Sequence, residues 1–133
     1  MRAEFLDTNI ILYLLDEGPK ADAAEGLLGD GAVISVQVLN EALVNCIRKA
    51  GMSWEEAGRF LFGIRQLCSV VDLTAQIHDV GRALGARYGF SVYDAMIVAA
   101  ALTNGCTTLY SEDMQDGLLV EDVLRIENPF RAL

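Results

Sequence analysis

Four carboxylic acids in this chain stand beside apolar segments, at places where folding could bring them together: Asp7, Glu41, Asp94 and Asp113. Carboxylate oxygens are the ligands that Mg²⁺ and Mn²⁺ prefer. Four such groups meeting in one cleft would hold a hard divalent cation, which makes a water molecule more acidic and stabilises a departing oxygen. The chemistry that this residue set predicts is metal-dependent hydrolysis of a phosphodiester.

Asp94 is the most informative of the four because it is the only charged residue between Ser91 and Leu102. A helix that is apolar on every face is buried, and a carboxylate that it takes inside is costly unless something compensates the charge. Two structural explanations stand beside metal binding. Asp94 could interact with the first-turn amides and the helix dipole, or it could pair with Arg82 or Arg87.

Asp7 and Glu41 have structural explanations as well. Asp7 joins a strand to a helix, where an aspartate often accepts a hydrogen bond from the first backbone amides, and its second oxygen could still meet a metal. Glu41 lies about one and a half turns into a helix and points away from its apolar face, so the segment alone favours a solvated surface glutamate. Its position still permits it to reach a cleft at the strand ends.

Asp113 belongs to an acid-rich loop after a strand, which by itself is ordinary turn chemistry. Asp116 in the same loop is a further candidate metal ligand and could equally be a turn residue. Ser111 could orient a ligand or a water molecule. Each of these signals is modest alone, and their specificity comes from the combination.

Strand-like and helical segments alternate along the chain, which predicts an α/β fold with a mostly parallel sheet and helices on both faces. We expect strands at 3–6, 32–35, 69–72, 107–110 and 123–127, and helices at 7–15, 20–28, 36–50, 53–68, 74–88 and 91–105. Ligands bind beyond the carboxyl ends of such strands. If the first and fourth strands are neighbours, Asp7 and Asp113 face one crevice.

Composition favours one domain, residues 1–133, with a real core, because 53% of the residues are hydrophobic. No apolar run approaches membrane length and no signal peptide is visible, so we expect a cytoplasmic protein. The surplus of apolar residues favours a partner interface.

The net charge of −9 argues against general binding to a phosphate backbone, although bound cations would invert the charge of an acidic site locally. Three widely spaced cysteines indicate reduced thiols.

Taken in this order on a β-α chain, the motifs resemble the PIN-domain family, and most closely the VapC-type ribonuclease toxins of bacterial toxin–antitoxin pairs. The resemblance covers essentially the whole chain. The segments that support it are Phe5-Leu6-Asp7-Thr8-Asn9, Ile34–Glu41, Ser91–Ala101, Leu109–Gly117 and Ile126-Glu127-Asn128-Pro129-Phe130.

The resemblance implies that Asp7, Glu41, Asp94 and Asp113 form the acidic quartet of a Mg²⁺- or Mn²⁺-dependent endoribonuclease, and that Asp116 matches a variable position. It also implies a five-stranded parallel sheet and a homodimer. A cognate antitoxin would place its C-terminal segment in the active-site groove. The RNA product would keep a 5′-phosphate and a free 3′-hydroxyl. The alternative function is a catalytically degenerate module of the same fold that acts through protein binding.

Other enzyme classes fit less well. A haloacid-dehalogenase-like phosphatase needs a second aspartate at position 9, where this chain has asparagine. A response-regulator domain needs a lysine after the strand at 107–110, and none follows it.

His78 is the only histidine, so a two-histidine ribonuclease mechanism is impossible, and we expect a structural role for it. We expect Trp54 to pack in the core or a dimer interface. The candidates for substrate contact are Arg48, Lys49, Arg82 and Arg87, but capping of a helix end or solvation of a surface is the stronger explanation for each of them.

Overall fold

The computed structural model describes residues 4–133, and they form a six-stranded sheet in the order β3-β2-β1-β4-β6-β5. Every neighbouring pair is parallel except β5 and β6, which are antiparallel. The strands are β1 (Glu4–Leu6), β2 (Ala32–Ser35), β3 (Cys68–Val71), β4 (Thr108–Tyr110), β5 (Leu119–Val120) and β6 (Leu124–Glu127).

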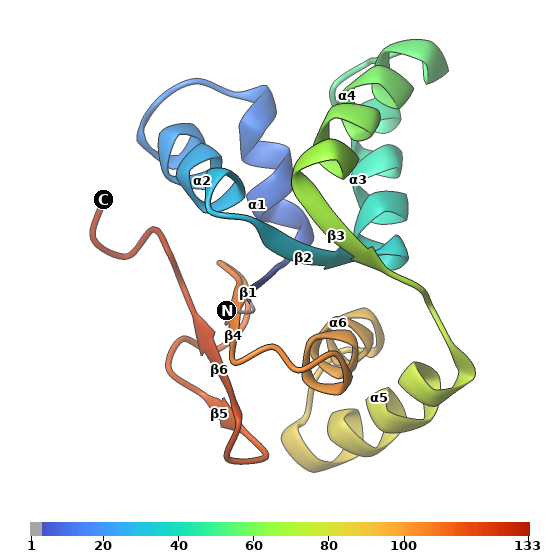
Figure 1. The fold of residues 1–133 in the computed structure, drawn as a ribbon, viewed down its shortest axis with the longest axis vertical. Coiled ribbons are helices and arrows are strands. Elements are labelled where there is room, and N and C mark those ends of the chain that lie inside the picture. The colour runs from blue at the N-terminus through green and yellow to red at the C-terminus, as the bar shows by residue number, and fades with distance from the viewer. Residues whose placement is uncertain (1–3) are drawn as a thin grey trace.

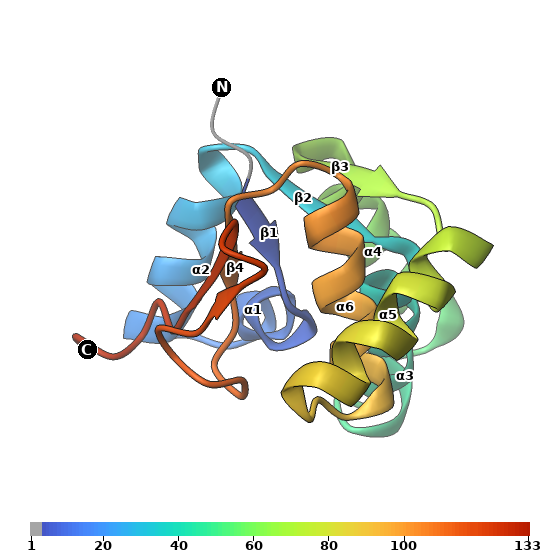
Figure 2. The ribbon, with the colours of Figure 1, turned by 90° about the horizontal axis from the view of Figure 1, so that it is seen from below.

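Helices cover both faces of the sheet, as the alternation of segments predicts. They are α1 (Thr8–Leu12) with the short 3₁₀ helix η1 (Tyr13–Leu15), α2 (Pro19–Gly29), α3 (Val36–Arg48), α4 (Trp54–Leu67), α5 (Ala75–Tyr88) and α6 (Val92–Thr103). In Figure 1, α1 to α4 lie above strands β2 and β3, and α5 and α6 lie below them. Figure 2 agrees, with α2 and α6 on opposite sides of β1.

The five expected strands and all expected helices are confirmed to within two residues at their ends, apart from Ala3, which lies outside the described residues. The sixth strand, β5, was not predicted. It has two residues, and the turn that follows it places Glu121 and Asp122 in the left-handed region, with φ of 51° and 58°. In most sequences an Asn-Gly or Asp-Gly pair indicates a turn of this kind, and this turn contains neither pair.

Local capping explains where the long helices begin. Ser53 and Glu56 form the predicted capping box at the start of α4, with both reciprocal hydrogen bonds present. Ser35, Thr74 and Ser91 accept hydrogen bonds from third-residue amides at the starts of α3, α5 and α6. Each of these helices is therefore fixed at its amino end by a side chain of the residue that precedes it.

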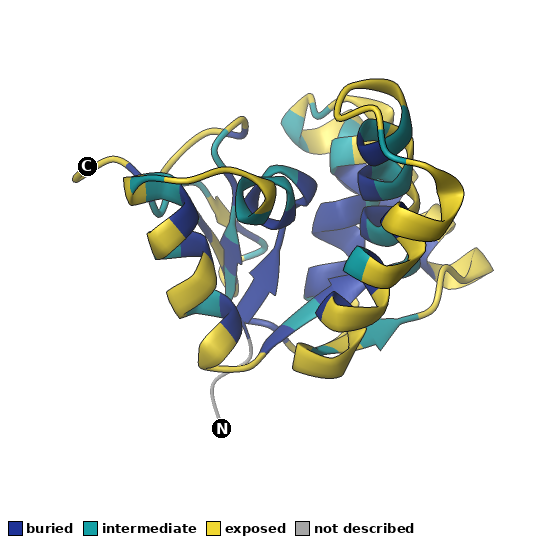
Figure 3. Cartoon of the chain, turned by 90° about the horizontal axis from the view of Figure 1, so that it is seen from above, coloured by how far each residue is buried: buried dark blue, intermediate teal, exposed yellow. Residues whose placement is uncertain are grey.

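The hydrophobic core lies between the sheet and its helices, and Figure 3 shows buried residues gathered at the centre of the molecule. The central strands contribute fully buried Phe5, Leu6, Ile34, Leu109 and Ile126. Burying each such side chain contributes about 1.5 to 3 kcal/mol. Within the part of the chain that the structure describes, no helix is both long and apolar enough to cross a bilayer.

The arrangement of β1 and β4 decides where a site can form. The two strands are parallel neighbours, with Leu6 opposite Tyr110 in the register. The residues that follow them, Asp7 and the loop from Ser111, therefore leave the sheet side by side, as the backbone hydrogen bond from Asp7 N to Tyr110 O confirms. The first turns of α1, α3 and α6 stand around this edge.

Candidate active site

Asp7 is the innermost acid of the predicted quartet, and only 5% of its surface is exposed. One carboxylate oxygen accepts from the Thr8 amide at 2.7 Å, which makes Asp7 the N-cap of α1, and the other accepts from the Ser111 hydroxyl at 2.8 Å. Burial raises the pKa of Asp7 to about 6, and the nearby charges of Asp94 and Glu41 add to the rise. Asp7 is thus a buried acid in the field of two others.

Glu41 is half-buried and does not behave as a free surface glutamate. Its carboxylate accepts from the Thr8 hydroxyl at 3.3 Å and from the Gln37 side-chain amide at 2.7 Å. Thr8 is the residue after Asp7, so the first hydrogen bond brings the middle of α3 to the carboxyl end of β1. The expectation that Glu41 reaches the strand ends therefore agrees with its contacts.

Asp94 stands in the first turn of α6, where the Ser91 hydroxyl accepts from its amide at 3.4 Å. From Ala95 the helix is almost wholly buried, as its apolar sequence predicts. The alternative pairing with an arginine is wrong, because Arg82 pairs with Asp79 and Arg87 with Glu121. Within residues 4–133, Asp94 is left half-buried without an ion-pair partner.

Asp113 is exposed at the mouth of the same region. It accepts a short hydrogen bond from the Asn9 side-chain amide, so it reaches back to the first turn of α1. Asp94 and Asp113 line one pocket of about 230 Å³, together with Tyr88, Phe90 and Met114. The segment Asp7-Thr8-Asn9 thus adjoins all three other acids: Asp7 lies near Asp94, Thr8 bonds Glu41 and Asn9 bonds Asp113.

Asp116, the further candidate ligand, is engaged elsewhere. Its two oxygens accept from the Asn128 amide at 2.8 Å and from Arg131 at 2.7 Å. These hydrogen bonds and the Arg131 charge hold the pKa of Asp116 below its ordinary value. Asp116 therefore anchors the C-terminal segment. Ser111, which is fully buried, donates to Asp7 and accepts from the Met114 amide, so it fixes an acid and its own loop.

The four acids share a region but do not form a closed ligand cage. Among residues 4–133, no group of three or more metal-ligating side chains stands close enough to hold an ion without rearrangement. Amide and hydroxyl donors from Asn9, Gln37, Thr8 and Ser111 occupy carboxylate oxygens instead. Donors of this kind lessen the repulsion between neighbouring carboxylates but supply no positive charge.

Asn9, Gln37 and Thr8 were not predicted as site residues. The sequence did contain an indication that Gln37 contacts Glu41, since Gln37 lies four residues before that acid on the same face of α3 and is polar in a mostly apolar stretch. Asn9 and Thr8 look like helix-start residues in the sequence. Their bonds to Asp113 and Glu41 span 104 and 33 residues, and no local pattern indicates them.

The residues outside the quartet mostly have structural roles or remain free at the surface. Trp54 is 73% exposed, so the expectation that it packs in the core is wrong, and a dimer interface stays a prediction. His78 is exposed on α5 and lines a largely apolar hollow with Arg82, Val92 and Met96. The three cysteines are free thiols, with Cys46 and Cys106 buried, as expected.

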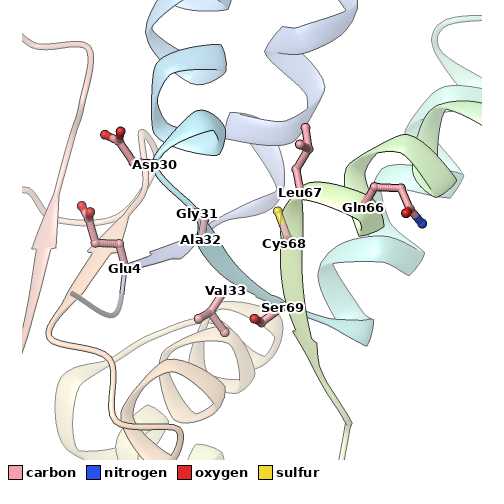
Figure 4. Close-up of a pocket in the computed structure, with 9 residues that line it drawn as sticks. All are labelled: Glu4, Asp30, Gly31, Ala32, Val33, Gln66, Leu67, Cys68 and Ser69. Carbon is pink, nitrogen blue, oxygen red and sulfur yellow. The ribbon is translucent and has the colours of Figure 1, made fainter. Parts of the chain in front are cut away.

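A further hollow lies at the opposite edge of the sheet, at the amino-terminal ends of β1, β2 and β3. Figure 4 shows Glu4 and Asp30 on one side of it and Leu67 and Cys68 on the other. Among residues 4–133, the charged side chains that line it are Glu4 and Asp30. Because the quartet follows the carboxyl ends of the strands, this pocket is separate from the candidate site.

Comparison with known proteins decides the family. A family model of the PIN domain matches residues 5–115, a span that contains Asp7, Glu41, Asp94 and Asp113 and ends before Asp116. The chain belongs to the PIN-domain family. No curated protein matches the sequence of this PIN domain.

Solved structures share the fold of this PIN domain at low sequence identity. A toxin–antitoxin complex from Klebsiella pneumoniae matches with a TM-score of 0.73 and 18% identity, covering 98% of each chain. DNA-bound VapBC from Salmonella typhimurium matches at 0.72 and 22%, covering 97% of this chain and 99% of its own. The sarcin–ricin loop cleaving toxin VapC20 of Mycobacterium tuberculosis matches at 0.67 and 22%, covering 83% and 89%.

Proposed function

We propose that this PIN domain is a metal-dependent endoribonuclease that acts as the toxin of a toxin–antitoxin pair. Membership of the family and the shared fold with VapC toxins support this function. The observation on which it depends most is the state of Asp7. This acid is buried beside the charges of Asp94 and Glu41, and the described residues offer it no cationic partner.

A divalent cation would supply the positive charge that the four acids lack. Within residues 4–133, none of the four acids is ion-paired to a lysine or arginine. A buried carboxylate without a counter-charge is costly, and structures retain one where it has a function. The side chains offered are all oxygen donors, which suits Mg²⁺ or Mn²⁺ and not zinc, since sulfur and imidazole ligands are missing from the set.

The roles follow from position and burial. Asp7, Asp94 and Asp113 would mainly bind the cation, and Glu41 would bind it or orient the attacking water. When bound, the cation would make a water molecule more acidic and offset the charge that develops on the phosphodiester. Ser111 and the Thr8 amide hold Asp7 in place, and Gln37 and Thr8 hold Glu41.

The test is cleavage of mixed RNAs by the purified protein with and without Mn²⁺, with Asp94→Asn as the inactive variant. We expect internal cleavage by the wild type only with the cation, and a loss of at least 100-fold in Asp94→Asn, as for the removal of a charged active-site group. Asp116→Asn is the matched control, because that acid binds Asn128 and Arg131. Equal activity of the wild type and Asp94→Asn would remove the catalytic assignment.

As a toxin, this PIN domain would bind a cognate antitoxin and a second copy of itself. It is supported by fold neighbours that were solved as toxin–antitoxin complexes, two of them bound to DNA. Expression of the chain alone should arrest growth, and co-expression with its cognate antitoxin should relieve the arrest and yield a complex. A chain that neither slows growth nor co-purifies with a partner would contradict the toxin assignment and favour the protein-binding alternative.

A further inference from the structure

The first turn of α6 presents a large aromatic side chain to solvent directly beside a quartet acid. Tyr93 is 68% exposed, and the next residue is Asp94. Large aromatic side chains with comparable exposure among residues 4–133 are Trp54 and Phe62, and both lie on α4. An exposed tyrosine ring offers a flat apolar face and a polar tip to a ligand, and Tyr93 differs from the two rings on α4 by its place next to Asp94.

Charge alone cannot hold an RNA strand at this site. The chain has a net charge of −9, and the quartet adds local negative potential. Of the basic residues considered for substrate contact, Arg82 and Arg87 are engaged with Asp79 and Glu121. Arg131 and Lys20 are likewise held, by Asp116 and Glu112. Arg48 and Lys49 lie at the opposite end of α3 from Gln37. A substrate strand therefore needs a source of affinity other than phosphate contacts, and base stacking on an aromatic ring is one that tolerates any sequence.

The backbone of Tyr93 is fixed where such a platform would be useful. The buried side chain of Gln37 donates to the Tyr93 carbonyl at 2.9 Å and to Glu41 at 2.7 Å. The same amide thus joins α3, Glu41 and the turn that bears both Tyr93 and Asp94. An exposed ring on an anchored backbone binds a base with little loss of main-chain entropy.

We propose that Tyr93 is a base-stacking residue that holds an unpaired nucleotide of a single-stranded RNA next to the acidic quartet. The inference rests on the proposed nuclease function and adds a substrate-contacting residue outside the quartet, one that requires an RNA base free to stack and not held in a continuous duplex.

Steady-state cleavage of a single-stranded RNA tests this inference. Tyr93→Ala should raise KM roughly 5- to 100-fold, the range expected for the loss of one base–aromatic stack, and change kcat by less than about threefold. Tyr93→Phe keeps the ring and should bring KM back near the wild-type value. Trp54→Ala and Phe62→Ala remove equally exposed rings on α4 and are the matched controls, with unchanged KM expected.

A binding measurement separates this inference from the nuclease proposal. In the Asp94→Asn background, fluorescence anisotropy should show tighter binding of a labelled single strand than of a duplex, and Tyr93→Ala should weaken only the single strand. A Tyr93→Ala enzyme with wild-type KM and wild-type binding would overturn the stacking role while cleavage by the wild type upheld the nuclease. Equal loss of binding in the Trp54→Ala and Phe62→Ala controls would also overturn it. Absence of both cleavage and single-strand binding by the wild type would overturn both proposals.

Discussion

At the scale of single residues, the account depends on how Asp7 is held. Its pKa of about 6 lies well above the ordinary value of 3.8 because the carboxyl group is buried, and Ser111 and the Thr8 amide offset only part of that cost. In the folded protein Asp7 therefore binds a proton more readily than in the unfolded chain. Between about pH 4 and pH 6 its contribution to stability falls as the pH rises, and above that window the cost is constant.

Asp7→Asn should accordingly stabilise the metal-free protein at pH 8. The shift of about two pKa units corresponds to roughly 3 kcal/mol, and the loss of the bond from Ser111 reduces the expected gain to about 1 to 3 kcal/mol. The gain should shrink below pH 6 and vanish near pH 4. Urea unfolding across this range measures it, and exposed Asp113→Asn should change stability by less than about 0.5 kcal/mol. Destabilisation by Asp7→Asn at every pH would contradict the burial argument.

The four candidate acids could be chosen from the sequence, whereas most of their hydrogen-bond partners could not. Asp94 stands out as one charge in an apolar helix, and Asp7 as an acid after a buried strand. Gln37 lies four residues before Glu41 on α3, which points to a contact with that acid, but its hydrogen bond to a carbonyl 56 residues away has no local signal. The helical wheel placed Glu41 on the polar side of α3, but only the position of α1 explains why that side meets Thr8.

At the scale of elements, Gln37 joins α3 to α6, and Asn9 joins α1 to the loop after β4. Gln37→Leu removes the amide and leaves the Tyr93 carbonyl and one Glu41 oxygen without this donor. Unsatisfied groups of this kind cost about 1 to 3 kcal/mol when buried. We expect cleavage to fall roughly tenfold, because the misplaced acid no longer sits in the productive geometry.

Thermal unfolding and single-turnover cleavage measure these two effects of Gln37→Leu separately. Gln66→Leu, the same change at an exposed position of α4, should leave both within the range of ordinary surface substitutions, about ±0.5 kcal/mol. Full activity in Gln37→Leu would show that the α3–α6 link does not position the quartet.

The loop that bears Asp113 is held on both sides. Glu112 bonds Tyr13 and Lys20, Asp116 bonds Asn128 and Arg131, and buried Phe130 packs edge-to-face on Tyr13 with centroids 5.1 Å apart. Phe130→Ala should cost about 3 to 5 kcal/mol of unfolding free energy, as for other buried aromatic truncations. Chemical denaturation measures this, with exposed Phe62→Ala as the control, and a cost below about 1 kcal/mol would contradict the packing.

Sequence patterns predicted the elements well where local physics decides them. Ser53 with Glu56 marked the start of α4, and the apolar run after Ser91 marked α6. Strand β5 was missed because its turn depends on a distant side chain: the Tyr88 hydroxyl accepts from the Glu121 amide and donates to the Glu121 carboxylate. Glu and Asp in left-handed conformations give no turn signal of their own.

At the scale of the whole molecule, the acidic balance sets how substrate can bind. A nuclease that neutralises six or more phosphates with lysine and arginine loses about 10³-fold in affinity between 50 and 200 mM salt. With a net charge of −9 and several basic side chains already paired, this protein should show less than about a tenfold change in KM for RNA over that range. A thousandfold change would contradict the view that stacking and cation contacts dominate.

On this account, Asp7, Glu41, Asp94 and Asp113 together bind Mg²⁺ or Mn²⁺ at the carboxyl edge of the sheet. Anomalous diffraction from crystals grown with Mn²⁺ tests it most directly. The account predicts a peak contacting Asp7 and Asp94, with Glu41 and Asp113 beside it. A peak in the hollow of Figure 4, against Glu4 and Asp30, or none at saturating Mn²⁺, would contradict it.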